Sequence, residues 1–149
     1  MDKIGLVISP KSLTYLRDLD HHNEAMKRGT RLAFYSIGKE NVRETKELIK
    51  KGPKTGRLYR IKGRKYRHRA SAPGEPPANL TGRLRKGVDF EVRGSDQMQF
   101  GDRVFYGFFL ERGTKKMRPR PHLSRAVKKN ERYAEQTLGL RSMEALTRI

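Results

Sequence analysis

The 149-residue sequence contains no cysteine and no tryptophan. The absence of cysteine excludes disulfide cross-links and thiolate metal sites, and it fits a reducing compartment. Long apolar runs are missing too: none approaches the ~20 residues that a membrane-spanning helix needs, and the N-terminus lacks the apolar stretch of a signal peptide. We therefore expect a soluble protein that is assembled in the cytoplasm and does not enter a membrane.

Hydrophobic residues are scarce, since they make up 34% of the chain, no more than the charged residues. At this length a single domain over residues 1–149 is expected, and its core must be thin. Segments poor in apolar residues order best against partners. We expect three such parts around the folded centre: an N-terminal arm (1–10), a basic and proline-rich loop (51–80) and a C-terminal extension (139–149).

Signatures of catalysis are absent as well. The sequence has no glycine-rich phosphate loop, no paired histidines at zincin spacing and no nucleophile motif. The acidic side chains are scattered among basic ones, which is typical of solvated counter-charges. The same interpretation is given to Glu75, Glu111, Asp89 and Glu91. The histidines are interpreted as surface residues: His21, His22, His68 and His122. The sequence predicts a protein that is not an enzyme and needs no cofactor or metal.

Acidic residues number only 16 against 35 basic ones, which gives a net charge of +19. The excess is concentrated in two segments. Residues 51–72 carry nine basic side chains and no acidic one, and residues 112–149 carry eleven basic and three acidic side chains. The first segment interleaves its charges with Tyr59 and Tyr66. Its candidate contact residues are Lys54, Arg57, Arg60, Lys62, Arg64, Lys65, Arg67 and Arg69.

Two interpretations of this basic segment stand side by side. A hairpin with this density of charge can contact a phosphate backbone, and its tyrosines can stack on bases. Alternatively, a solvated loop that is kept extended by self-repulsion folds against an acidic neighbouring protein. The charge alone also suits a free nucleic-acid-binding protein, which is the alternative function.

The N-terminal third is expected to be mainly helical. Residues 3–9 place Ile4, Leu6 and Ile8 at every second position and predict a short strand or an extended arm. This segment is followed by a short helix near residues 11–19, a break at 21–23 and a longer helix that ends at 51–53. Two glycines, Gly29 and Gly38, weaken this helix unless close packing needs them. Its predicted buried residues are Met26, Ala33, Phe34, Ile37 and Leu48.

Strand patterns dominate the centre. Residues 57–61 and 65–69 predict a hairpin that turns at 62–64, and residues 88–92 alternate in the manner of a half-buried strand, followed by a second strand around 98–100. A third apolar segment, 104–110, completes the centre of the predicted fold. A C-terminal helix is expected over 122–135, interrupted near Gly139. Its predicted buried residues are Leu123, Ala126, Val127 and Tyr133. The fold class is α+β, a small antiparallel sheet packed by a long N-terminal helix and a C-terminal helix.

Several short motifs follow one another in a fixed order. They are PKTGRL at 53–58, ASAPGEPP at 70–77, LTGRLR at 80–85, YGFFLERGT at 106–114 and RPRPHL at 118–123. This order resembles the minor tail-component or neck family of long-tailed double-stranded DNA phages. The resemblance covers about residues 50–130. The motif residues that carry it are Thr81, Gly82, Leu84, Arg85, Tyr106, Glu111, Gly113, Thr114, Arg120 and Pro121.

The resemblance implies a structural virion protein at the head-tail junction. Such a subunit is one of six or twelve copies in a ring between the head connector or stopper and the tail tube or tail terminator, and the genomic double-stranded DNA passes through that ring. Neck proteins serve as adaptor, stopper, tail-completion or tail-terminator subunits, and the sequence leaves these roles open. The Arg-rich insertion after residue 57 and the extension from residue 139 depart from the family pattern.

The motif residues are predicted mainly to shape the fold. Gly82 and Gly113 suit tight turns, and Thr81 suits the cap of a short helix. Glu111 is expected to be held by a nearby arginine, which would fix the segment before Gly113.

Overall fold

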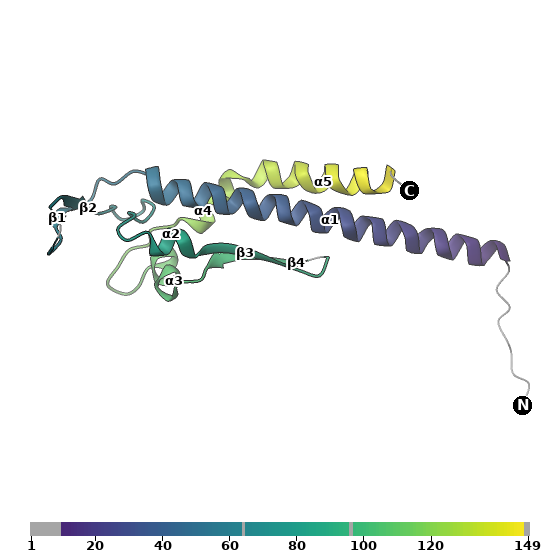
Figure 1. Ribbon diagram of the computed structural model, residues 1–149, viewed down its shortest axis with the longest axis horizontal. Helices are drawn as coiled ribbons and strands as arrows, with labels where there is room; N and C mark the ends of the chain where they lie inside the picture. Colours follow the sequence, from purple (N-terminus) through teal and green to yellow (C-terminus); the bar gives the residue numbers. More distant parts are fainter. Residues whose placement is uncertain (1–9, 64, 96, 148–149) are drawn as a thin grey trace, which may run out of the picture.

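A computed structural model of the chain describes residues 10–63, 65–95 and 97–147. The molecule is long and narrow (Figure 1). Helix α1 (Pro10–Lys51) forms its axis. Helix α5 (Glu131–Thr147) lies along one side of α1, and the hairpin of β3 (Val88–Arg93) and β4 (Gln97–Asp102) lies along the other. The strand or arm expected at 3–9 lies outside the described residues.

Helix α1 is one continuous helix of 42 residues, about 63 Å long at 1.5 Å per residue. The predicted break at 21–23 is therefore wrong. No proline or glycine stands at that point, and the helix propensities of His and Asn cost only a few tenths of a kcal/mol each. The His22 ring nitrogen Nδ1 even lies 2.6 Å from the Asp18 carbonyl oxygen, one helical turn earlier.

Small residues on α1 let its neighbours come close. A Cβ atom at Gly29 would lie 2.6 Å from the carbonyl oxygen of Arg141 on α5, and one at Gly38 would lie 2.2 Å from the ring of Phe90 on β3. Both distances are shorter than any real contact of a Cβ atom. The two glycines that weaken the helix locally are thus the points at which α5 and the sheet pack against it.

The predicted buried face of α1 is mostly correct. Ala33 and Ile37 are buried, and Phe34 and Leu48 are half-buried. Met26 is the exception, because its side chain is 38% exposed. Ala25, one position earlier, is buried instead.

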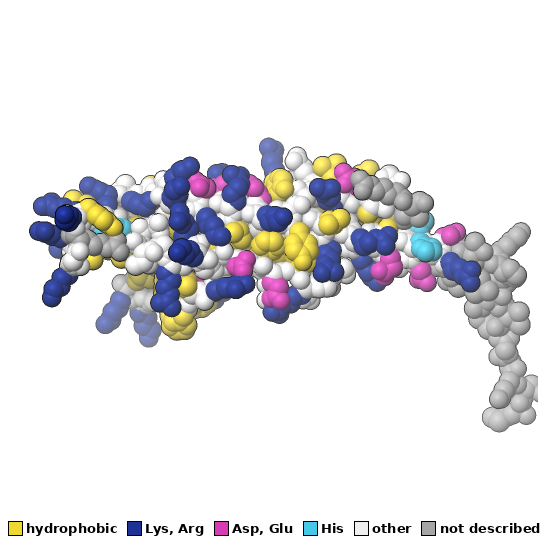
Figure 2. All heavy atoms as spheres, viewed as in Figure 1, with side chains coloured by type: hydrophobic (Ala, Val, Ile, Leu, Met, Phe, Trp, Pro, Cys, Tyr) yellow, Lys and Arg dark blue, Asp and Glu magenta, His cyan; other side chains and the backbone are white. Residues whose placement is uncertain are grey.

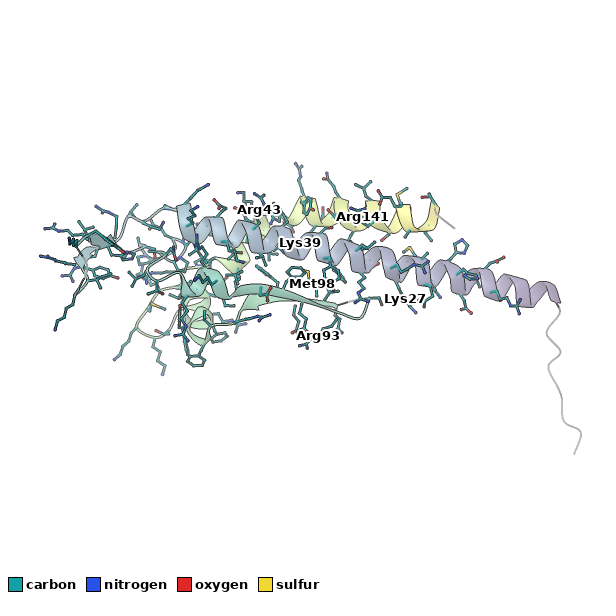
Figure 3. All side chains as sticks on the ribbon, viewed as in Figure 1. Lys27, Lys39, Arg43, Arg93, Met98 and Arg141 are labelled. Carbon is teal, nitrogen blue, oxygen red and sulfur yellow. The ribbon has the colours of Figure 1, made fainter. Side chains whose placement is uncertain are left out.

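The β3–β4 hairpin confirms the two central strands. Its antiparallel register runs from Val88 opposite Asp102 to Arg93 opposite Gln97. Alternation places one side of each strand toward α1, so that Met98 lies between the hairpin and the helix while Arg93 points away from it (Figure 3).

The apolar core lies where α1, the sheet and a short helix meet. Its buried members are Ile49 on α1, Val88 on β3 and Leu84 on α2 (Arg83–Gly87). The half-buried side chains packed around them are Val42, Phe100, Val104, Leu110 and Leu123. This core holds together the C-terminal end of α1 and the start of the sheet.

The apolar segment 104–110 forms a helix, α3 (Phe105–Arg112), and not a strand of the core. Its aromatic residues follow at spacings of three and four, which is the helical period. Phe105 is 84% exposed and Phe108 is 57% exposed. The segment contributes Val104 and Leu110 to the packing around the core, while its aromatic residues lie on the outer side of α3.

The C-terminal region consists of two helices, α4 (Leu123–Lys129) and α5. The two helices are separated at Asn130. The side-chain amide of this residue donates a 3.0 Å hydrogen bond to the side-chain oxygen of Asn41 on α1. Lys129 contacts Glu44 on α1 at 2.6 Å. The expected interruption at Gly139 is wrong, since this residue lies inside α5.

The predicted buried side of the C-terminal helix is only partly correct. Ala126 is buried and Leu123 is half-buried, but Val127 and Tyr133 are exposed. The part of α5 that the structure describes contains no buried residue. The α+β class is confirmed, with a long N-terminal helix, antiparallel strands and C-terminal helices; α5 packs on α1, on the side opposite the β3–β4 hairpin. Among the described residues no helix has the length and apolarity needed to span a bilayer.

A pair of glycine substitutions tests the packing of α1. Gly38→Ala should lower the free energy of unfolding by about 1–3 kcal/mol, because the new methyl group overlaps the Phe90 ring. Gly139→Ala is the matched control: its Cβ meets no atom within 4 Å, so it should stabilise α5 by about 0.5–1 kcal/mol. Urea denaturation measures both, and equal effects of the same sign would contradict the packing described.

Candidate functional site

The basic segment forms the predicted hairpin. Strand β1 (Leu58–Arg60) pairs with β2 (Arg67–Arg69) in an antiparallel register that sets Tyr59 opposite His68. The two rings also meet edge to face at 5.5 Å. The hairpin lies beyond the C-terminal end of α1, at one tip of the molecule (Figure 1).

The tip is densely basic (Figure 2). Arg57, Arg60, Lys62, Lys65, Arg67 and Arg69 are all exposed. None of these six takes part in an ion pair within the described part of the chain. Lys54 differs, since it is half-buried and its Nζ donates a 2.7 Å hydrogen bond to the Lys50 carbonyl at the end of α1. Arg64 lies outside the described residues.

Glu75 fixes the base of this hairpin. Its carboxylate accepts hydrogen bonds from the Thr55 hydroxyl (2.6 Å), the Thr55 amide (2.9 Å) and the Ala72 amide (2.7 Å). These bonds, the hydroxyl bond foremost, hold the pKa of Glu75 below its usual value. Glu75 thus joins the two chain segments that enter and leave the hairpin, and its interpretation as a mere counter-charge is wrong.

The two segments also touch through their backbones. The Gly56 amide donates to the Ala70 carbonyl at 3.0 Å, and the Ala70 amide donates to the Arg57 carbonyl at 3.0 Å. A Cβ at Gly56 would lie 2.7 Å from the Ser71 carbonyl oxygen. The close approach therefore needs glycine at this position.

Replacing Glu75 tests how the hairpin is held. In Glu75→Ala the amides of Gly56, Ala70 and Ala72 should exchange with solvent markedly faster, because the link between the two segments is lost. Glu91→Ala removes an exposed carboxylate from β3 and should leave those amides unchanged. Hydrogen exchange followed by mass spectrometry measures both, and unchanged exchange in Glu75→Ala would contradict the role given to Glu75.

The first motif segment builds the start of α2. Gly82 adopts a left-handed backbone conformation with φ of 80° immediately before the helix. The Thr81 hydroxyl accepts the Arg83 amide at 3.3 Å. Leu84 enters the core, and Arg85 is half-buried. The expected tight turn at Gly82 is present, but the helix cap predicted for Thr81 is wrong, because Gly82 is the N-cap residue and no side chain of the described residues makes a cap hydrogen bond there.

The second motif segment builds the end of α3. Gly113 has φ of 78°, and its amide donates to the Phe109 carbonyl at 2.8 Å. Thr114 and Met117 form an isolated antiparallel bridge. The Arg120 amide then donates to the Leu110 carbonyl at 2.7 Å, which brings the chain back along α3 before Pro121.

His122 is the centre of the motif region. Its imidazole is fully buried, and it lies between the carboxylates of Asp102 and Glu111: Nε2 is 2.8 Å from Asp102 Oδ2, and Nδ1 is 3.0 Å from Glu111 Oε2. Burial lowers the pKa of His122, but hydrogen bonds to the two carboxylates outweigh it and raise the pKa to about 9. The imidazole is therefore a buried cation at neutral pH.

Glu111 is held by His122 and by the start of α4, and not by an arginine as expected. Its carboxylate accepts the amides of His122 (2.8 Å), Leu123 (3.0 Å) and Ser124 (2.9 Å), and also the Ser124 hydroxyl. Burial raises the pKa of Glu111, but these hydrogen bonds outweigh it and keep the pKa far below its usual value. The solvated state predicted for Glu111 is wrong.

This cluster is structural in its geometry. The imidazole separates the two carboxylates and contacts one oxygen of each with its own nitrogens. Within the described ranges no group of three or more acidic or histidine side chains is arranged to hold a metal ion. The prediction of a surface His122 is wrong, and Asp102 was missed entirely. The only sequence signal was the position of His122 directly after the Arg-Pro motif.

The buried histidine predicts a pH dependence of stability. A raised pKa in the folded state stabilises the fold below the unfolded value of about 6.5, and this stability is lost as the pH rises toward 9. The free energy of unfolding should fall by about 3 kcal/mol between pH 6 and pH 9.5 through this group. His122→Gln should abolish that difference, whereas the exposed-site control His22→Gln should retain it. Urea titrations at the two pH values measure both.

A cavity of about 270 Å³ lies between the basic hairpin, the loop 77–82 and α3. Five motif residues line it: Thr81, Gly82, Leu84, Tyr106 and Arg120. The structure thus brings half of the motif residues, from three separate segments, to one cavity. The hairpin contributes Tyr59 and His68 to the same wall.

Comparison with family models, with curated proteins and with solved structures finds no match to this chain. The functional argument therefore depends on the residues and the geometry described above.

Proposed function

We propose that the protein is a structural subunit of the head-tail junction of a long-tailed DNA phage. It forms or completes a ring between the head connector or stopper and the tail tube or tail terminator, and the genome passes through this ring. The ring has six or twelve copies, is assembled in the host cytoplasm and remains in the virion. The protein acts in assembly and not as an enzyme.

The observation that carries this proposal is the shared location of the motifs. LTGRLR, YGFFLERGT and RPRPHL are separated in sequence, yet they meet around α3, the buried His122 and the adjacent cavity. A series of short motifs that builds one compact unit supports a real family resemblance better than isolated matches do.

The exposed apolar side chains support assembly with neighbours. Phe105 and Phe108 on α3 are largely exposed, as are Leu140 and Met143 on α5. Large exposed apolar patches commonly mark protein contacts. A molecule with so thin a core gains stability when adjacent subunits cover such surfaces, and head-to-tail contacts that close by rotation produce rings.

Electron microscopy of the purified protein, alone and with purified heads or tails, tests the proposal. We expect closed rings with a central pore wide enough for duplex DNA. A protein that stays monomeric and joins neither heads nor tails would overturn the proposal.

A free nucleic-acid-binding protein remains the second candidate, favoured by the unpaired basic side chains of the hairpin. This second function predicts that the isolated subunit binds duplex DNA with a steep salt dependence. The logarithm of the association constant falls by about 0.9 per neutralised phosphate for each tenfold rise in salt concentration. A ring subunit must let DNA slide, so we expect weak binding by the isolated chain. Filter binding at several salt concentrations separates the two functions.

A further inference from the structure

The cavity beside the hairpin offers hydrogen-bond donors and no negative charge. Arg120, Tyr106 and Asn79, whose side chains all carry hydrogen-bond donors, belong to its lining, and no acidic side chain does, among the residues that the structure describes. The exposed cations of the hairpin lie at the same tip of the molecule (Figure 2). The cavity therefore favours a negatively charged group.

Arg120 is the charged residue of this lining, and its guanidinium is incompletely satisfied. The Arg120 backbone is fixed by its bond to the Leu110 carbonyl, but the only hydrogen-bond partner of the side chain in the described structure is the Met117 sulfur, 4.0 Å away. The buried Nε has no partner. A buried donor without an acceptor is unfavourable, and a guanidinium binds carboxylate and phosphate groups through paired, charge-assisted hydrogen bonds.

We propose that this cavity receives the carboxylate side chain of a glutamate or aspartate from a neighbouring protein in the assembly. The inference rests on the proposed function and names the chemistry of one partner contact. Arg120 binds the carboxylate, Tyr106 and Asn79 add hydrogen bonds, and the basic hairpin attracts the acidic surface around it.

The shape of the cavity favours a protein side chain over DNA. Its walls include Pro77, Leu84 and Leu110, which suit the methylene groups that precede a carboxylate. Phosphates of a duplex stay on the surface of a stiff polymer and are contacted by exposed side chains. A side chain carried by a flexible peptide can enter a recess of this size.

Binding of a defined peptide to the full chain tests the proposal. The probe is a blocked hexapeptide of alternating leucine and glutamate, and its partner probe replaces each glutamate with glutamine. We expect the glutamate peptide to shift the NMR amide signals of Asn79 and Thr81, and the glutamine peptide to bind at least tenfold more weakly. Equal binding of the two peptides would overturn the proposal.

Two substitutions locate the contact. Arg120→Gln should weaken binding of the glutamate peptide at least tenfold, whereas Arg118→Gln removes the same charge from an exposed position two residues away and should weaken it less than twofold. Tyr106→Phe keeps the ring and removes only the hydroxyl, so it tests the cavity even if Arg120→Gln does not fold; it should weaken binding several-fold. Equal losses in Arg118→Gln and Arg120→Gln, or none in Tyr106→Phe, would contradict the assigned site.

A duplex oligonucleotide is the third probe. If it shifted the signals of Asn79 and Thr81, and Arg120→Gln abolished that shift, the cavity would be a phosphate site and the proposal would be wrong. Failure here is separable from failure of the proposed function. Rings seen by microscopy without peptide binding would overturn only the cavity contact, and peptide binding without rings would overturn only the ring.

Discussion

The buried ion cluster of Asp102, Glu111 and His122 is the interaction on which the rest of the molecule depends. One imidazole joins the end of β4, the end of α3 and the start of α4. Because α4 leads directly to Asn130 and α5, the same contact determines where the chain returns to α1. A lost partner would leave an uncompensated buried charge, which is far more costly than the loss of an exposed ion pair.

Polar contacts are important for holding the elements together because the molecule has few apolar contacts. Among the described residues, three of the seven buried hydrophobic side chains of the core are alanines, and nearly as many buried residues are polar, among them Asn41, Thr45 and Asn130. Alanine and glycine contacts bring helices close but bury little area per residue. The elements of the described chain are thus held together by close backbone approach and by a few specific hydrogen bonds between them.

The elements with a clear period could be predicted from the sequence: the hairpins near 58–69 and 88–102, and the helical character of α1. The tertiary contacts between these elements could not be predicted. Phe105 to Leu110 is apolar enough for a core strand, and only tertiary packing leaves its aromatic residues outside. His122 looks like any polar residue before a helix, because its two partners are 11 and 20 positions away. The cavity escaped prediction for the same reason: its lining comes from the hairpin, the loop, α3 and Arg120 together.

The length of α1 has a mechanical consequence. Gly29 already lies beside Arg141 and Ala145, near the end of α5, so the first turns of α1 extend beyond both α5 and the sheet (Figure 1). A single helix held at one end acts as a lever. The span from Pro10 to Ala25 measures about 22 Å, so a tilt of about 10° where the helix is held would displace its tip by about 4 Å. Small adjustments at the packed centre are therefore magnified at the far end of the molecule.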